Sequence, residues 1–418
     1  MSMHLATMPE RNAVPIGLIG GASEVRRALV VVRWPVGGIR THLLANYPIA
    51  AAAGWRFTFV GPADGSLDAL RESLQGVPRT EYIGVPVKRR SCSLWPTVRG
   101  LVRDGGFDLI HSHGLTAAVH AVAANVGLRI PHVATLHEPL QPCRFSGLLG
   151  PFKRWALGRL MRRPDAIVVV SEDARANLLQ YFPTLAGRPH RIATIPNGVR
   201  IRRPTDVPRD DSLRRRLGAA PDAALIGFLG RFMPEKGFSV LLEAVQRLAA
   251  DPSAPPFHVA AFGSGDYRIE YSREVRRRGL SDRVTLLDFT PDVHPVLRQL
   301  GLVVVPSLWE ASSLISMEAM TAGVPVLGSD CPGLREVLRG TPSRTVAAGD
   351  ADALRHGLYL ALTRPWTEAA RSFAAAARSR FDVVRSTQRL LDLFDRLTGK
   401  GSGVRGQGSE QAQAPVAA

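Results

Sequence analysis

The feature that most constrains the fold of this chain is a repeated alternation of short apolar runs with longer segments of helical periodicity. The first runs with strand-forming composition cover residues 28–32, 57–60, 109–110, 132–136, 166–170 and 192–195. Strands that alternate with helices need crossover connections, so they form a parallel sheet that is covered on both faces. This part of the chain is therefore predicted to be a doubly wound α/β domain.

The same alternation resumes after a polar, proline-containing link at 202–208. The second set of predicted strands covers residues 225–229, 258–262, 284–287, 302–305 and 325–327. A chain of 418 residues is long enough for two such cores. Ligands of these sheets bind outside the carboxyl ends of the strands, so we expect a site in a cleft between two Rossmann-like domains.

The predicted boundaries follow from this pattern. The first domain is expected at 27–200 and the second at 201–382, with a last helix at about 383–398 that could pack back on the first domain. Residues 1–26 and the Gly-, Ser-, Gln- and Ala-rich tail at 399–418 are predicted to be disordered.

The charge of the chain, +17 with a pI near 11.0, raises nucleic acid or an anionic membrane as partners. Only four of the 53 basic residues are lysine, and the basic residues are spread along the chain without interleaved aromatic residues. We therefore expect no nucleic-acid partner, a solvated basic surface, and an acidic or membrane-bound partner as the second choice.

Location is predicted from the cysteines and the apolar runs. Three cysteines lie far apart without the spacing of a zinc knuckle or a disulfide framework, which fits a reducing cytosol. The N-terminus lacks a signal pattern, and no run approaches the ~20 apolar residues of a spanning helix. The protein is expected to be cytoplasmic, at most peripheral on the inner face of a membrane.

The stretch 230–237, GRFMPEKG, joins a predicted strand to a helical pattern at 238–248. Two fixed cations in one turn, Arg231 and Lys236, repel each other unless an anion joins them. The stretch is not a Walker loop, because in that motif the lysine follows the last glycine, whereas here Gly237 follows Lys236. The turn therefore predicts an anion site at the end of a strand.

A second segment, 306–323, supports this prediction. Ser312 and Ser313 are plausible N-caps of a helix at 314–321, whose first amides form an anion site. Glu310 precedes that turn and Glu318 lies about one turn into the helix. Two cations, a helix N-terminus and two carboxylates that accept from sugar hydroxyls together fit a nucleotide sugar.

These segments and others in the same order carry a resemblance to a known family. The other matches are Pro35-Val-Gly-Gly-Ile39, Asp108-Leu-Ile-His-Ser-His113, Thr135-Leu-His-Glu138, Val170-Ser-Glu172, Ile195-Pro-Asn-Gly-Val199, Ala322-Gly-Val-Pro-Val326 and Gly333-Leu-Arg-Glu336. Over roughly residues 28–398 the chain resembles the retaining glycosyltransferases of the GT-B fold, family four. The resemblance implies a metal-independent hexosyltransferase without a cofactor, acting on a nucleotide-diphosphate sugar and a glycan or lipid-linked acceptor, in polysaccharide or lipopolysaccharide biosynthesis.

The resemblance also implies roles for single residues. Arg231 and Lys236 bind the donor diphosphate, Glu310 contacts the transferred sugar, Glu318 accepts from the ribose, and His113 lies near the reacting sugar. The remaining donor-binding positions that we expect are Gly37, Gly38, Gly230, Ser312, Ser313 and Leu314. Ala311, Ser312 and Ser313 replace the Pro-Phe-Gly that often follows the first glutamate of the family, so the sugar pocket differs from the usual one.

No metal site is expected. His111 and His113 alternate at the end of a predicted strand and are expected to face opposite sides, which makes them poor ligands for one ion. His137 and Glu138 lack the second histidine of HExxH, so a zinc hydrolase is not supported.

Residues 145–163 mix apolar and cationic residues at helical spacing. This pattern fits a helix on a membrane surface equally with a helix that faces the core, and three glycines weaken either helix.

Two other functions remain open at this point. One keeps the fold in an epimerase or a phosphorylase-like enzyme; a phosphorylase of the glycogen type would need a cofactor lysine, and Lys236 is the only lysine between Lys153 and Lys400. The other is a non-catalytic nucleotide-binding protein.

Overall fold

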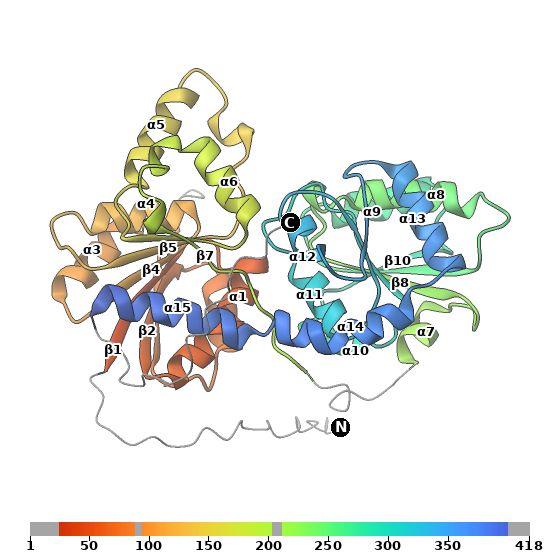
Figure 1. Ribbon diagram of the computed structural model, residues 1–418, viewed down its shortest axis with the longest axis horizontal. Helices are drawn as coiled ribbons and strands as arrows, with labels where there is room; N and C mark the ends of the chain where they lie inside the picture. Colours follow the sequence, from red (N-terminus) through yellow and green to blue (C-terminus); the bar gives the residue numbers. More distant parts are fainter. Residues whose placement is uncertain (1–24, 88–93, 203–210, 400–418) are drawn as a thin grey trace, which may run out of the picture.

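The computed structural model describes residues 25–87, 94–202 and 211–399. Residues 1–24 and 400–418 of the predicted disordered ends and residues 203–208 of the predicted link lie outside these ranges. The predicted limit of disorder at residue 26 was wrong, because Arg26 is already part of the first strand, where its guanidinium pairs with Asp395 at 2.5 Å. Two α/β units lie side by side (Figure 1).

The first unit contains a sheet of seven parallel strands within the described residues. In spatial order the strands are β3 (Thr80–Val85), β2 (Trp55–Pro62), β1 (Arg26–Val32), β4 (Leu109–His113), β5 (His132–Leu136), β6 (Ala166–Val169) and β7 (Ile192–Thr194). Its helices are α1 (Gly37–Ala52), α2 (Ser66–Ser73), α3 (Trp95–Asp104), α4 (Leu115–Ala124), α5 (Gly150–Leu160) and α6 (Glu172–Tyr181). The strand order reverses between β1 and β4, and ligands of doubly wound sheets bind at such a point.

The second unit contains a sheet of six parallel strands within the described residues. In spatial order they are β10 (Val284–Leu287), β9 (Phe257–Phe262), β8 (Ala224–Leu229), β11 (Leu302–Val305), β12 (Val326–Ser329) and β13 (Arg344–Val346). Its helices are α7 (Ser212–Leu217), α8 (Phe238–Ala249), α9 (Arg268–Arg277), α10 (His294–Leu297), α11 (Leu314–Thr321), α12 (Leu334–Leu338), α13 (Ala351–Thr363) and α14 (Thr367–Arg380). Here the order reverses between β8 and β11.

Separate hydrophobic clusters hold the helices to the two faces of each sheet. In the first unit Leu43 and Phe394 belong to the cluster on one face, whereas Val98 and Ala117 belong to the other. The residues of the central strands β4, β5 and β6 are all buried, as expected for strands whose side chains are covered on both sides. The fold class predicted from the sequence, two doubly wound domains, is confirmed.

Two chain segments connect the units and run side by side. Val199 and Phe381 share a backbone hydrogen bond of 2.8 Å, and Val383 donates to Val199 at 3.1 Å. A Cβ on Gly198 would lie 2.5 Å from the Cα of Val383, so only glycine permits this approach. The last helix, α15 (Val383–Thr398), then packs against α1 of the first unit, as the blue ribbon shows (Figure 1).

No helix among the described residues has the length and apolar composition that a membrane span requires.

Candidate functional site

Two loops meet at the strand-order reversal of the second sheet. One follows β8 and carries GRFMPEKG, and the other follows β11 and begins at Pro306. The ammonium of Lys236 lies 2.6 Å from Oε1 of Glu310, which also accepts from the hydroxyl of Ser307 at 2.9 Å. The amide of Leu308 donates to the carbonyl of Glu235 at 2.8 Å. The structure therefore brings together two of the predicted catalytic side chains, Lys236 and Glu310.

Gly237 allows this close approach of the two loops. It has a φ of +67°, and a Cβ at this position would lie 1.9 Å from the carbonyl oxygen of Pro306. Gly230 lies at the start of the same loop and donates to the carbonyl of Phe262 at 3.0 Å. The glycines of GRFMPEKG thus set the path of the backbone, and the charged residues lie between them.

Arg231 faces the other unit. Its guanidinium lies 3.6 Å from Glu235, and a Cβ built on Gly37, at the start of α1, would lie 3.3 Å from its Nε. Both predicted diphosphate ligands therefore have an acidic partner, Glu235 or Glu310. These two carboxylates offset the charge of the cations, and the binding of an external anion by Arg231 and Lys236 stays a prediction.

The N-terminus of α11 lies next to this ion pair. The helix begins at Leu314 as predicted, and Ser313 is its N-cap residue. The hydroxyl of Ser313 bonds to that of Ser316 at 2.9 Å and does not cap the helix. The hydroxyl of Ser312 is buried, and the described part of the chain offers it no hydrogen-bond partner. First-turn amides and an unpartnered hydroxyl favour an anionic or hydroxylated ligand here.

Glu318 is half-buried on α11, and its carboxylate has no hydrogen-bond or ion-pair partner among the described residues. Burial, with a smaller contribution from the negative charge of Asp292, raises its pKa to about 7. A carboxylate that loses water without gaining a donor is destabilised in its charged form. Hydroxyl groups of a ligand would supply the missing donors.

In the first unit, α1 has its N-terminus at the strand-order reversal of the sheet. Gly37 has a φ of +56° and opens the helix after Val36. No heavy atom lies within 4 Å of a Cβ built on Gly38, so there is open space beside this glycine. Gly37 therefore makes room for the side chain of Arg231, and Gly38 leaves open space beside the α1 backbone.

His113 ends β4 and is buried at the base of this region. Its Nε2 lies 2.8 Å from the hydroxyl of Tyr47, and its Nδ1 lies 2.8 Å from Nε2 of His137. His111 contacts the same tyrosine hydroxyl through Nδ1 at 2.7 Å, and the two histidine rings are 4.2 Å apart. The prediction that His111 and His113 face opposite sides was wrong, because residues two apart on a strand share a face.

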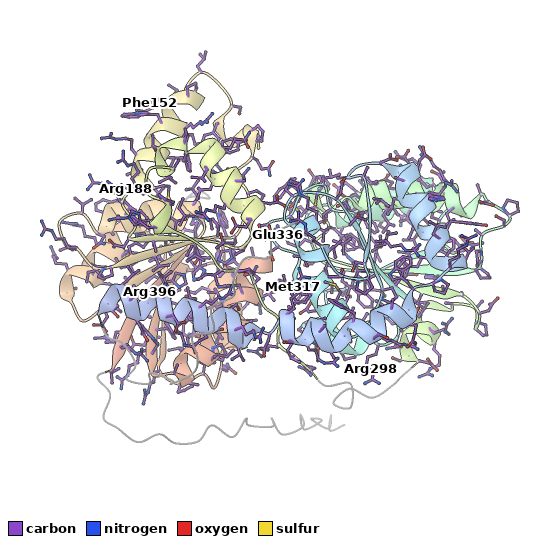
Figure 2. The ribbon with its side chains drawn as sticks, in the orientation of Figure 1. Phe152, Arg188, Arg298, Met317, Glu336 and Arg396 are labelled. Carbon is purple, nitrogen blue, oxygen red and sulfur yellow. The ribbon has the colours of Figure 1, made fainter. Side chains whose placement is uncertain are left out.

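The two units contact each other through the motifs Val170-Ser-Glu172 and Gly333-Leu-Arg-Glu336, to which the sequence assigned no role. The backbone amides of Glu172 and Asp173, at the start of α6, donate to the carboxylate of Glu336 on α12, both at 3.1 Å. The carboxylate of Asp173 in turn accepts from the amide of Gly333 at 2.8 Å and from Arg335 at 2.6 and 3.0 Å. Glu336 lies where the two units meet (Figure 2). The N-termini of α6 and α12 thus cap each other in a direct contact between the units.

The pairing with Arg335 lowers the pKa of Asp173, since it stabilises the charged carboxylate. Sequence reasoning missed Asp173 because its partners lie about 160 residues away.

The described geometry defines a class of protein. Two doubly wound domains face each other, and a cation–carboxylate pair and two helix N-termini lie at their strand-order reversals. This is the GT-B architecture of glycosyltransferases. A structure of Anabaena HepE in complex with UDP-glucose superposes with a TM-score of 0.75 at 23% identity, covering 89% of this chain and 100% of that one.

Family models match both halves of the chain: Glycosyltransferase Family 4 at residues 36–203 and Glycosyl transferases group 1 at residues 209–380. The 2-deoxystreptamine N-acetyl-D-glucosaminyltransferase of Streptomyces fradiae is 30% identical over 71% of this chain and 72% of its own length. The phosphatidyl-myo-inositol mannosyltransferase of Mycolicibacterium smegmatis is 26% identical over 89% of this chain and 94% of its own length. The chain belongs to the group 1 glycosyltransferases of the GT-B fold.

Proposed function

We propose that this glycosyltransferase moves a sugar from a nucleotide-diphosphate donor to a hydroxyl of a glycan or glycolipid acceptor, with retention of anomeric configuration and without a metal ion. The observation that carries the proposal is the Lys236–Glu310 pair, which lies beside the N-terminus of α11 and near Arg231 at the cleft. A neighbour of the same fold was solved with UDP-glucose, which supports a nucleotide sugar as donor.

The reaction follows from the charges. As the glycosidic bond breaks, negative charge grows on the leaving diphosphate, and Arg231 and Lys236 stabilise that charge more in the transition state than in the ground state. An ammonium has three donors, so Lys236 can keep Glu310 and also bind a phosphate oxygen. The first-turn amides of α11 add fixed partial positive charge at the same place.

Retention is assigned to same-face attack, in which the leaving phosphate helps to deprotonate the acceptor hydroxyl. Lys236 and Ser307 both bind Oε1 of Glu310 and hold this carboxylate in one orientation. Glu310 orients hydroxyls of the transferred sugar, and Glu318 accepts hydrogen bonds from the ribose.

A ligand screen tests the donor class. We expect UDP, GDP or ADP, or the matching sugar nucleotide, to raise the melting temperature in the presence of EDTA. A ligand at about 100 times its Kd stabilises by roughly 2.7 kcal/mol. NMR of the product formed with simple sugar acceptors then reports the anomeric configuration. Inverted product contradicts retention, donor that is only epimerised supports an epimerase, and the lack of any thermal shift contradicts the proposed donor class.

We also propose that the first unit contacts a membrane through α5 and the residues before it. Leu148, Leu149, Phe152 and Trp155 are 102%, 76%, 64% and 60% exposed, although apolar side chains of this size normally seek burial. Phe152 projects from the first unit, away from the second (Figure 2).

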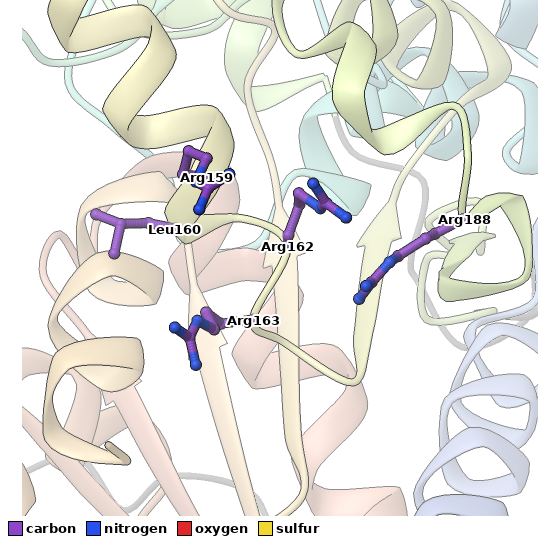
Figure 3. A pocket seen from close by; sticks show the side chains of 5 residues that line it. All are labelled: Arg159, Leu160, Arg162, Arg163 and Arg188. Atoms are coloured by element: carbon purple, nitrogen blue, oxygen red, sulfur yellow. The ribbon is translucent and has the colours of Figure 1, made fainter. Parts of the chain in front are cut away.

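Cationic side chains gather at the C-terminal end of α5, where the guanidinium of Arg159 lies 5.9 Å from the centroid of the Trp155 ring. Arg159, Arg162, Arg163 and Arg188 surround a pocket of about 450 Å³ (Figure 3), and in the described part of the chain no acidic group pairs with them. Apolar residues next to unneutralised arginines fit a surface of anionic lipid, where the charge attracts and the apolar groups insert. An acceptor on a lipid carrier, and a location on the inner face of the membrane, follow from this contact.

Vesicle sedimentation tests the membrane contact. We expect the protein to bind vesicles of phosphatidylcholine with phosphatidylglycerol but not of phosphatidylcholine alone. The double change Phe152→Ser and Trp155→Ser is expected to reduce the bound fraction more than tenfold, whereas Val126→Ser, at an equally exposed site on the same unit, leaves it unchanged. Equal binding of the two variants would contradict the contact.

A further inference from the structure

Three histidines from distant parts of the sequence meet below the cleft. His42 comes from α1, His113 ends β4, and His137 follows β5. One ring nitrogen from each lies within 4.8 Å of the others. The centroid of the His137 ring lies 4.8 Å from the centroid of the His42 ring and 5.1 Å from that of the His113 ring.

Hydrogen bonds at the outer side of two of these rings allow tautomers that leave an inner nitrogen free to bind a ligand. Nδ1 of His42 lies 3.1 Å from Oδ1 of Asn197, which only accepts, and 3.3 Å from Nδ2 of Asn46. In the tautomer that donates to Asn197 at the shorter distance, Nε2 keeps a lone pair. Nε2 of His113 can donate to the hydroxyl of Tyr47, which leaves its Nδ1 free to accept. The hydroxyl of Tyr47 then donates to Nδ1 of His111, and Nε2 of His111 donates to the hydroxyl of Thr135 at 2.8 Å. Each hydrogen bond in this series then has one donor and one acceptor.

Nε2 of His42 makes no hydrogen bond to any described residue. This nitrogen is buried, and the residue as a whole is only 9% exposed. A buried acceptor that loses water without gaining a donor costs about 1–3 kcal/mol. Nothing in the proposed transfer reaction uses this atom.

We propose that His42, His113 and His137 bind one Zn²⁺ ion. Imidazole nitrogens suit zinc, and three protein ligands leave the fourth tetrahedral position open. The hydrogen bonds from His42 to Asn197 and from His113 to Tyr47 are the outer contacts that orient histidine ligands in metal sites. In the unliganded site His113 and His137 share a hydrogen bond of 2.8 Å, and the ion replaces it.

The consequence for the enzyme depends on the function proposed above. If His113 lies near the reacting sugar, an ion on its Nδ1 holds the ring in place and occupies the base of the acceptor side. Zinc then acts as an inhibitor of a transferase that needs no metal for catalysis. The site itself does not depend on that role.

Metal titration tests the site without an activity assay. Protein without a histidine tag, treated with chelator, is titrated with Zn²⁺ by calorimetry and with Co²⁺ by visible absorption, which reports tetrahedral coordination. We expect one ion per chain, with binding at least tenfold weaker in His42→Asn and in His137→Asn. The control, His356→Asn, changes an exposed histidine on α13 and is expected to bind like the parent protein.

The outcomes separate the site from the proposed function. No stoichiometric binding, or equal binding by His42→Asn and His356→Asn, overturns the site. Zinc that binds and inhibits supports both inferences. Zinc that binds without inhibition supports the site and contradicts the role given to His113.

Discussion

Replacing Lys236 by alanine is expected to abolish the nucleotide-induced thermal shift and to lower kcat by about 10³-fold. This is near the upper end of the loss in kcat that follows removal of one hydrogen-bond donor to the negative charge of a transition state. Lys236 has its ammonium 2.6 Å from Glu310, at a point where α11 begins and GRFMPEKG turns. No other described lysine lies on this unit, since Lys153 belongs to α5. Donor titration and single-turnover assays measure the two effects separately.

The same change leaves the side chain of Glu310, 11% exposed, without its cation, so a fall in stability is also expected. The double variant Lys236→Ala, Glu310→Gln removes that unpaired charge, and we expect it to regain stability but not activity. Lys153→Ala, in which an exposed lysine on α5 loses its bond to the carbonyl of Arg144, is the matched control for donor binding. An undiminished thermal shift in Lys236→Ala would remove the proposed diphosphate site.

Replacing Glu318 by glutamine is expected to stabilise the free protein at pH 8 and to weaken nucleotide binding. The folded-state pKa of Glu318 is raised from 4.5 to about 7, so the native state holds this proton more tightly than the unfolded state does. Its favourable contribution to stability is therefore complete below pH 4.5 and is lost as the pH rises through 7. Glutamine mimics the protonated form at every pH.

The expected gain is up to about 3 kcal/mol at pH 8 and close to zero at pH 4.5, from 1.36 kcal/mol for each unit of pKa shift. Denaturant unfolding at both pH values measures it, with the exposed Glu368→Gln as control. Nucleotide affinity is expected to fall roughly 10- to 100-fold, as for the loss of a hydrogen bond to a charged group. A variant that binds nucleotide normally would show that Glu318 does not contact the ribose.

Local pattern predicted most of the secondary structure around the site. The strand at 302–305 and the helix at 314–321 have the predicted bounds, because a buried parallel strand is a continuous apolar run and serine marks the helix start. Two strands were missed, Thr80–Val85 and Arg344–Val346. Both lie at an edge of their sheet and are only partly buried, so they lack such a run.

The histidine cluster shows a different limit. The sequence indicated His113 and His137 through separate motifs, but His42 and Tyr47 lie inside α1, where nothing in the local pattern distinguishes them from core residues. Their meeting depends on how α1 packs over β4 and β5. The partners of Arg231 and Lys236 were missed for the same reason, since charge along the sequence does not say which carboxylate faces which cation.

The sequence by itself determined the two α/β domains and the positions of their glycine turns and helix starts, because periodicity, backbone conformation and capping act between residues close along the chain. Only the tertiary structure decided that Glu310 neutralises Lys236, that Asp173 and Glu336 join the units, and that three histidines converge. Those contacts join residues from 24 to more than 160 positions apart, and their energies depend on burial and distance, which no local pattern contains.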